Sequence, residues 1–129
     1  MNRYYCRFLS QGPLDHLKVM GGLQEFLGPG LQWQDHQNGM SVQFNSPWEW
    51  PHVASRVRAI SRDHPEFMFR LYQEGPKSAM EWQVTNGESF AFGEFFPRRN
   101  PESFRHIQQI CRGESLLPEI HGAAGPEQQ

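Results

Sequence analysis

Apolar and polar residues alternate along five stretches of the chain, and this two-residue period is typical of half-buried strands. The stretches are residues 3–9, 31–45, 66–73, 80–85 and 90–96. The second contains Asn38-Gly39, a pair that favours a tight hairpin turn, so we expect it to form two strands. We predict a register that places Trp33 opposite Phe44, with both rings on one face. Six strands are therefore expected.

Three other segments carry apolar residues at the three- and four-residue spacing of amphipathic helices. They are residues 14–27, 51–62 and 101–111. The glycines and proline of residues 28–30 should end the first helix, and Asn100 is the expected N-cap of the third.

A second Asn-Gly pair, Asn86-Gly87, separates the last two strands. A two-residue loop without a bulge would turn the phenylalanines that follow away from the core. We favour a three-residue loop with a bulge, which pairs Trp82 with Phe92 and Val84 with Phe90.

The expected order is strand, helix, two strands, helix and strand, followed by two further strands and a terminal helix. This order predicts an α+β fold, a two-layer ferredoxin-like sandwich with the first two helices on one face of an antiparallel sheet. The extra strands would extend the sheet beside the fourth strand, and the last helix would cover part of what remains exposed. We expect one domain over residues 1–113 and a mobile tail over residues 114–129, where periodicity is lost.

Composition narrows the class of protein. Apolar residues make up only 37% of the 129 residues, but 10 Phe, 4 Trp and 3 Tyr can compensate, since each large ring buries much area. The net charge of -2 gives no overall attraction to nucleic acid or anionic lipid. The chain carries no secretory signal pattern and no apolar run of membrane-spanning length, so we expect a soluble cytoplasmic protein without a membrane partner.

Residues with reactive or metal-binding side chains show no catalytic pattern. Cys6 and Cys111 fall on apolar faces and are expected to be buried, reduced thiols. The six histidines and two cysteines include no pair at metal-ligand spacing, so we expect no metal and no other cofactor. Without a nucleophile motif or a phosphate-binding loop, we expect no catalytic residues and no enzyme activity.

Residues 47–92 contain a more specific pattern. They include the runs SPWEWP, DHPEFMFRLYQEG and EWQVTNG, separated by a short helix and a turn. This arrangement resembles the YubB-type ferredoxin-like domains of plasmids and other mobile elements. The resemblance covers about a third of the chain and consists mainly of structural signals, so it implies a fold and a mobile-element context. It brings no catalytic motif to this chain.

The sheet face opposite the core is one candidate binding site. We expect it to display Tyr5, Arg7, Arg70 and Tyr72. RNA-recognition domains of the same topology stack bases on sheet aromatics, which makes nucleic acid the alternative partner. The aromatic strand motif of those domains is absent, however, and alternating Tyr and Arg are also typical of an ordinary solvated surface.

Trp48 and Trp50 form the second candidate site. They flank Glu49 in the segment before the second helix, where only one ring can easily turn inward. Tryptophan contributes strongly to protein interfaces, although both rings could instead cover the core. We favour a non-enzymatic interaction domain that binds a protein or a second copy of itself, as a mobile-element accessory protein acting on a host complex.

Overall fold

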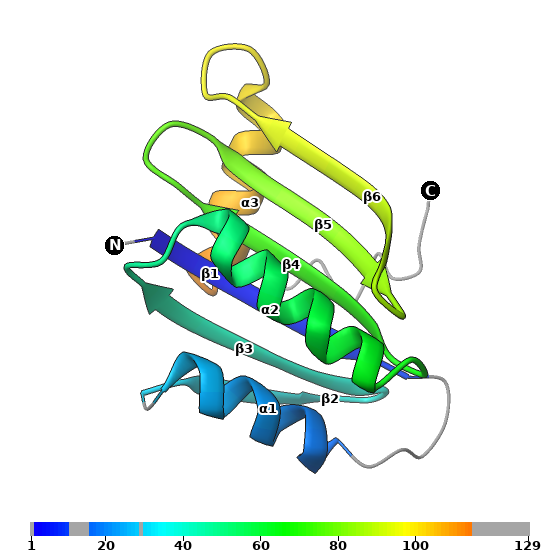
Figure 1. The fold of residues 1–129 in the computed structure, drawn as a ribbon. Coiled ribbons are helices and arrows are strands. Elements are labelled where there is room, and N and C mark those ends of the chain that lie inside the picture. The colour runs from blue at the N-terminus through cyan, green and yellow to red at the C-terminus, as the bar shows by residue number, and fades with distance from the viewer. Residues whose placement is uncertain (1, 11–15, 29, 115–129) are drawn as a thin grey trace.

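The fold is α+β, with a six-stranded antiparallel open sheet and three helices (Figure 1). The computed structural model describes residues 2–10, 16–28 and 30–114. In chain order the elements are β1 (Asn2–Leu9), α1 (Leu17–Leu27), β2 (Gln32–His36), β3 (Gly39–Ser46), α2 (Trp50–Asp63), β4 (Met68–Glu74), β5 (Ala79–Thr85), β6 (Glu88–Phe95) and α3 (Pro101–Cys111). The strands lie side by side in the order β2-β3-β1-β4-β5-β6, and each neighbouring pair is antiparallel.

The main core lies between the sheet and the helices α1 and α2, which share one face of it (Figure 1). Phe44, Phe69 and Trp82 belong to this core, and Trp33 packs against it. The prediction that these four rings gather on one side of the sheet is therefore confirmed. Alternation along the strands places every second side chain on this face, where α1 and α2 exclude water.

A second, smaller core lies on the other face, beneath α3 (Figure 1). Its buried members are Tyr5, Tyr72, Ala79, Ile107, Ile110 and Cys111. The terminal helix thus covers part of the surface that α1 and α2 leave exposed, and the face that it covers is the one expected to be open.

Both cysteines are free and buried, which confirms the prediction of two buried thiols. Burial raises the pKa of Cys6 to about 12 and also raises the pKa of Cys111, because a low-dielectric environment disfavours the thiolate. Neither sulfur is therefore an activated nucleophile at neutral pH.

The register of the first hairpin differs from the prediction. Trp33 pairs with Val42 instead of Phe44, and the two residues between the strands are Gln37 and Asn38. Gly39 is part of β3, where it is buried and lies opposite Leu9 of β1. The glycine therefore serves a close approach between strands and not the turn. The shift is two residues, so the faces of the side chains are unchanged.

The second hairpin contains the predicted bulge at a different position. Trp82 pairs with Phe92 as expected, but Val84 pairs with Ser89, and the register shifts between Gln83 and Val84. Asn86 and Gly87 both have positive φ, at 52° and 76°, as a two-residue type I′ turn requires. The extra residue is thus inside the strand and not in the loop.

No helix in the described part of the chain is long and apolar enough to cross a membrane. The mobile tail predicted for residues 114–129 lies, apart from residue 114, outside the described residues.

Candidate functional site

The four residues proposed for the sheet face form a compact block on the two central strands. The register of β1 and β4 places Tyr5 opposite Tyr72 and Arg7 opposite Arg70. The centroids of the two tyrosine rings are 5.9 Å apart. The structure therefore brings these four residues together on the face opposite the main core, as the alternation predicted.

This block is not an open surface, and that part of the prediction is wrong. Tyr5 and Tyr72 are each only 9% exposed, because α3 packs over them. Arg7 is 6% exposed, and Arg70 is only partly exposed. Bases cannot stack on tyrosines that a helix covers, so the nucleic-acid alternative loses the platform on which it was based.

The charges around the block agree with a buried environment. Burial raises the pKa of Tyr72 to about 12, an increase that the neighbouring Arg70 partly offsets. Burial also raises the pKa of Glu81 on β5, and Arg70 again acts in the opposite direction. The Arg70 guanidinium therefore stabilises nearby anionic forms within the fold.

Trp48, which precedes α2, and Trp50, its first residue, contact different neighbours. Trp50 is partly buried, with its ring centroid 6.2 Å from that of Trp82 and 6.1 Å from that of Phe92. Trp48 contacts Phe26 of α1, with a centroid distance of 4.7 Å, and is 40% exposed. The expectation that only one ring turns inward is confirmed, with Trp50 as the inward ring.

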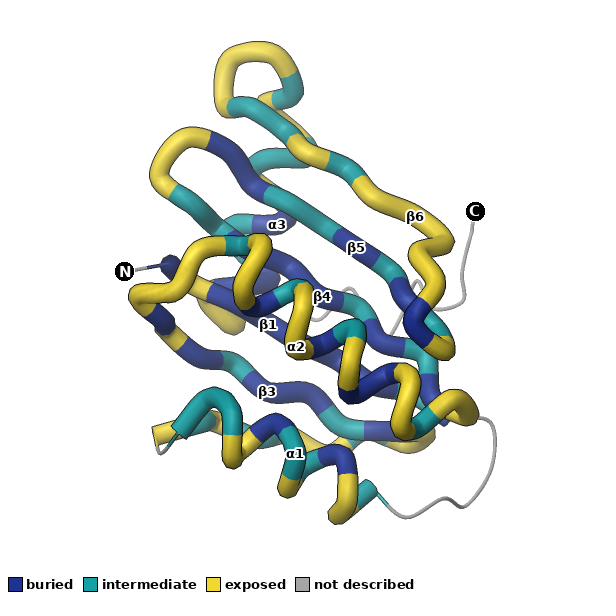
Figure 2. The backbone as a smooth tube through the Cα atoms, viewed as in Figure 1, coloured by how far each residue is buried: buried dark blue, intermediate teal, exposed yellow. Residues whose placement is uncertain are grey.

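An exposed aromatic surface on β6 was not predicted from the sequence. Phe90 is 65% exposed and Phe92 is 55% exposed, although Phe92 lies opposite Trp82 on the core-facing side. Figure 2 shows that β6 is exposed along most of its length. Its outer edge pairs with no other strand of the described residues.

The number of helices explains this exposure. Packed helices are roughly 8–10 Å apart, whereas strands are about 4.8 Å apart, so two helices cover about four strands. Six strands exceed this width: Trp50 and Arg58 of α2 still cover Trp82 on β5, and β6 at the edge is left exposed. The sequence contained one signal for this exposure, because six predicted strands are more than two predicted helices can cover. That signal indicates exposure at an edge of the sheet without saying which strand forms the edge.

Metal binding has no geometric support in the described residues. No group of three or more His, Cys, Asp or Glu side chains lies close enough there to hold a metal ion.

A hydrogen-bonded carboxylate connects α3 to the end of β4. Glu74 accepts hydrogen bonds from Gln108 Nε2 at 2.9 Å and from Arg112 Nε and Nη2 at 3.0 and 2.7 Å. Burial raises the pKa of Glu74, but the hydrogen bonds from Arg112 and Gln108 outweigh it and hold the pKa below the ordinary 4.5.

The lowered pKa of Glu74 predicts a stability difference in acid. A carboxyl group with a depressed folded-state pKa adds stability above its unfolded pKa, and this stability is lost as the pH falls through the folded-state value. We expect Glu74→Gln to be less stable than the wild type at pH 7, with the difference narrowing below about pH 4.5. Urea unfolding at several pH values measures the difference in free energy of unfolding between the two proteins. A stability difference that stays constant down to pH 3 would contradict a lowered pKa of Glu74 in the folded protein.

Comparisons with protein families, with curated proteins and with solved structures find no match to this chain, so the resemblance of residues 47–92 remains a prediction.

Proposed function

We propose that this chain is a non-enzymatic interaction domain that binds another protein through an aromatic strip made of Trp50, Phe90 and Phe92. The observation that carries the proposal is the exposure of Phe90 and Phe92, at 65% and 55%, on the edge strand of the sheet. Exposed apolar side chains that lie together mark interaction sites, and aromatic residues dominate interface energies. Trp50, one of the two tryptophans of the predicted Trp48–Trp50 surface, lies against Phe92 of this strand, with ring centroids 6.1 Å apart.

The strip has a firm base beneath it. Arg58 lies over the Trp82 ring, 5.2 Å from its centroid, and donates a hydrogen bond to the Gly87 carbonyl at 3.0 Å. The indole N–H of Trp82 donates to Ser89 Oγ at 2.8 Å. These contacts hold the start of β6 against α2 and β5. The surface is therefore already ordered before a partner binds, and binding loses less conformational entropy.

The outer edge of β6 supports a protein partner over nucleic acid. Between residues 91 and 95 the strand pairs regularly with β5, so its other edge presents backbone N–H and C=O groups at strand spacing. An extended segment of a partner, or of a second copy, can add to such an edge and place apolar side chains beside Phe92. Buried Tyr5 and Tyr72 offer nucleic acid no comparable platform.

The proposed context is that of a cytoplasmic accessory protein of a mobile element, built on an extended ferredoxin-like fold. The strand order β2-β3-β1-β4, with α1 and α2 on one face, supports this fold because two interleaved β-α-β units give such an order. The resemblance of residues 47–92 supports the mobile-element context, and a host complex is the proposed target.

The test compares proteins captured by the wild type and by Phe92→Ser from nuclease-treated lysate of the native host. We expect a defined set of proteins to be reduced by at least about tenfold with Phe92→Ser. Leu17→Ser is the matched control, since Leu17 is a 72% exposed apolar residue on α1. Light scattering on the purified protein tests self-association in the same variants.

Three results would contradict the proposal. They are equal capture by Phe92→Ser and the wild type, equal loss with Leu17→Ser, and capture by the wild type from a parallel untreated lysate that is absent from the nuclease-treated one. The last result would favour the nucleic-acid alternative.

A further inference from the structure

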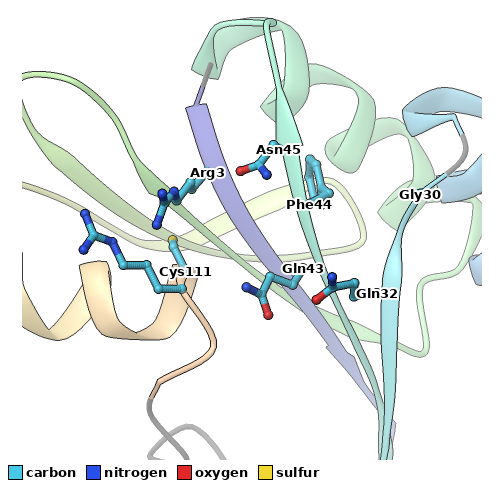
Figure 3. Close-up of a pocket in the computed structure, with 8 residues that line it drawn as sticks. Arg3, Gly30, Gln32, Gln43, Phe44, Asn45 and Cys111 are labelled. Atoms are coloured by element: carbon cyan, nitrogen blue, oxygen red, sulfur yellow. The ribbon is translucent and has the colours of Figure 1, made fainter.

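A small polar pocket lies on the α3 side of the sheet, near the end of the sheet opposite to β6 (Figure 3). Its volume is about 140 Å³. The polar side chains that line it come from β1, β2, β3 and the end of α3: they are Arg3, Gln32, Gln43, Asn45 and Arg112.

Strand register brings four of these side chains together. Arg3 of β1 lies opposite Asn45 of β3, and Gln32 of β2 lies opposite Gln43 of β3. Gln43 and Asn45 are two residues apart, so they share a face of the sheet. Figure 3 shows Arg3 near Asn45 and Gln32 near Gln43, with Cys111 at the end of α3 beside them.

The end of α3 closes the pocket on a second side. Gly113, directly after Arg112, has a φ of 74° and lies against Gln43: a Cβ added there would be 2.7 Å from Gln43 Oε1. This close approach fixes the position of the α3 end relative to β3. The pocket is therefore lined from two layers of the fold, with β1, β2 and β3 as its floor.

The pocket has two cations and no anion in its lining. Arg3 is exposed and forms no hydrogen bond or ion pair with the residues that the structure describes. Arg112 donates through Nε and Nη2 to Glu74, which holds its guanidinium in place beside the pocket. Two carboxylates, Glu74 and Glu114, act electrostatically on Arg112, so the guanidinium of Arg3 is the cation of the lining that no carboxylate of the described residues holds by a hydrogen bond.

We propose that this pocket binds the phosphate group of a small phosphorylated molecule. Guanidinium groups bind oxyanions through paired N–H donors, and the three amides supply further N–H donors. A carboxylate has two oxygens in one plane, which a single arginine satisfies. Donors from three strands and a helix instead suit a tetrahedral group, whose oxygens point in several directions. The site is independent of the aromatic strip, which lies at the other end of the sheet.

The test is a titration of the folded protein with inorganic phosphate, followed by NMR chemical shifts. We expect saturable shifts at Arg3, Gln43 and Asn45, and affinity at least about tenfold weaker for Arg3→Gln, since a charge-assisted contact is lost. Arg105→Gln is the matched control, because Arg105 is an exposed arginine of α3 outside the pocket lining. Circular dichroism verifies that both variants are folded.

Acetate and two phosphate esters complete the experiment. We expect acetate to bind at least about tenfold more weakly than phosphate, since it can use only part of the donor set. Ribose 5-phosphate and glycerol 3-phosphate distinguish a nucleotide-like source of the phosphate from a lipid-like one. The proposal is overturned by an absence of saturable shifts at the pocket, by equal binding of acetate, or by Arg3→Gln binding phosphate as the wild type does.

Discussion

Replacing Phe8 with alanine is expected to lower the free energy of unfolding by about 3–5 kcal/mol, a large part of the stability of a small domain. Phe8 is completely buried in β1, at the centre of the main core. Its ring centroid lies 5.7 Å from that of Phe67, 5.8 Å from that of Phe69 and 6.4 Å from that of Trp33.

Truncation at this position removes both the buried area of the ring and the contacts that three other rings make with it. Trp33 lies on β2, Phe69 on β4 and Phe67 directly before β4, so these rings cannot collapse into the space without moving the sheet, and a cavity should remain. Urea denaturation monitored by tryptophan fluorescence measures the change.

Phe90→Ala is the matched control for Phe8→Ala. The same atoms are removed, but Phe90 is 65% exposed, so we expect a change within about 0.5 kcal/mol. If Phe8→Ala also stayed within that range, β1 would not be the centre of the core, and the arrangement of the two layers would be in error.

The main core could be predicted because two periodicities agree there. Alternation places Tyr4, Cys6 and Phe8 on one side of β1, and helical spacing places Val53 and Val57 on one side of α2. The strand and the helix each have one apolar face that must be buried. These two faces therefore pack against each other. The position of the elements follows from local sequence, and their bounds agree with the prediction to within a few residues.

The candidate site could be predicted less well, because exposure depends on which elements lie above a surface. The alternation of Tyr5 and Arg7 is the same whether α3 covers them or not. α3 is far from β1 in the sequence, and its apolar stripe only indicates that it packs on something. The burial of Tyr5 and the exposure of Phe92 both result from this long-range arrangement, which no local pattern contains.

Hairpin register had a similar limit, since Asn-Gly occurs twice with different outcomes. At Asn86-Gly87 both residues adopt positive φ and form the turn. At Asn38-Gly39 neither does, and the glycine pairs with Leu9 of β1. The contact that determines the place of Gly39 is with β1, some thirty residues earlier in the chain. The Asn-Gly dipeptide alone therefore could not distinguish the two hairpins.

Gly39→Ala is accordingly expected to lower the free energy of unfolding by about 2–3 kcal/mol, near the upper end for overpacking in a core. A Cβ at this position would clash with the carbonyl oxygen of Phe8 and would lie 3.0 Å from the Cα of Leu9. Both obstacles are backbone, so β1 and β3 must separate to relieve the clash, which weakens the hydrogen bonds between these two interior strands.

Gly21→Ala distinguishes this effect from a general response to glycine replacement. Gly21 lies inside α1, and a Cβ there would meet nothing within 4 Å. Alanine should therefore stabilise the helix by about 0.5–1 kcal/mol, because glycine loses more backbone entropy on folding. Urea denaturation of both variants should give changes of opposite sign. Equal changes would mean that Gly39 does not approach β1 closely, and that the turn itself determines the register of the hairpin.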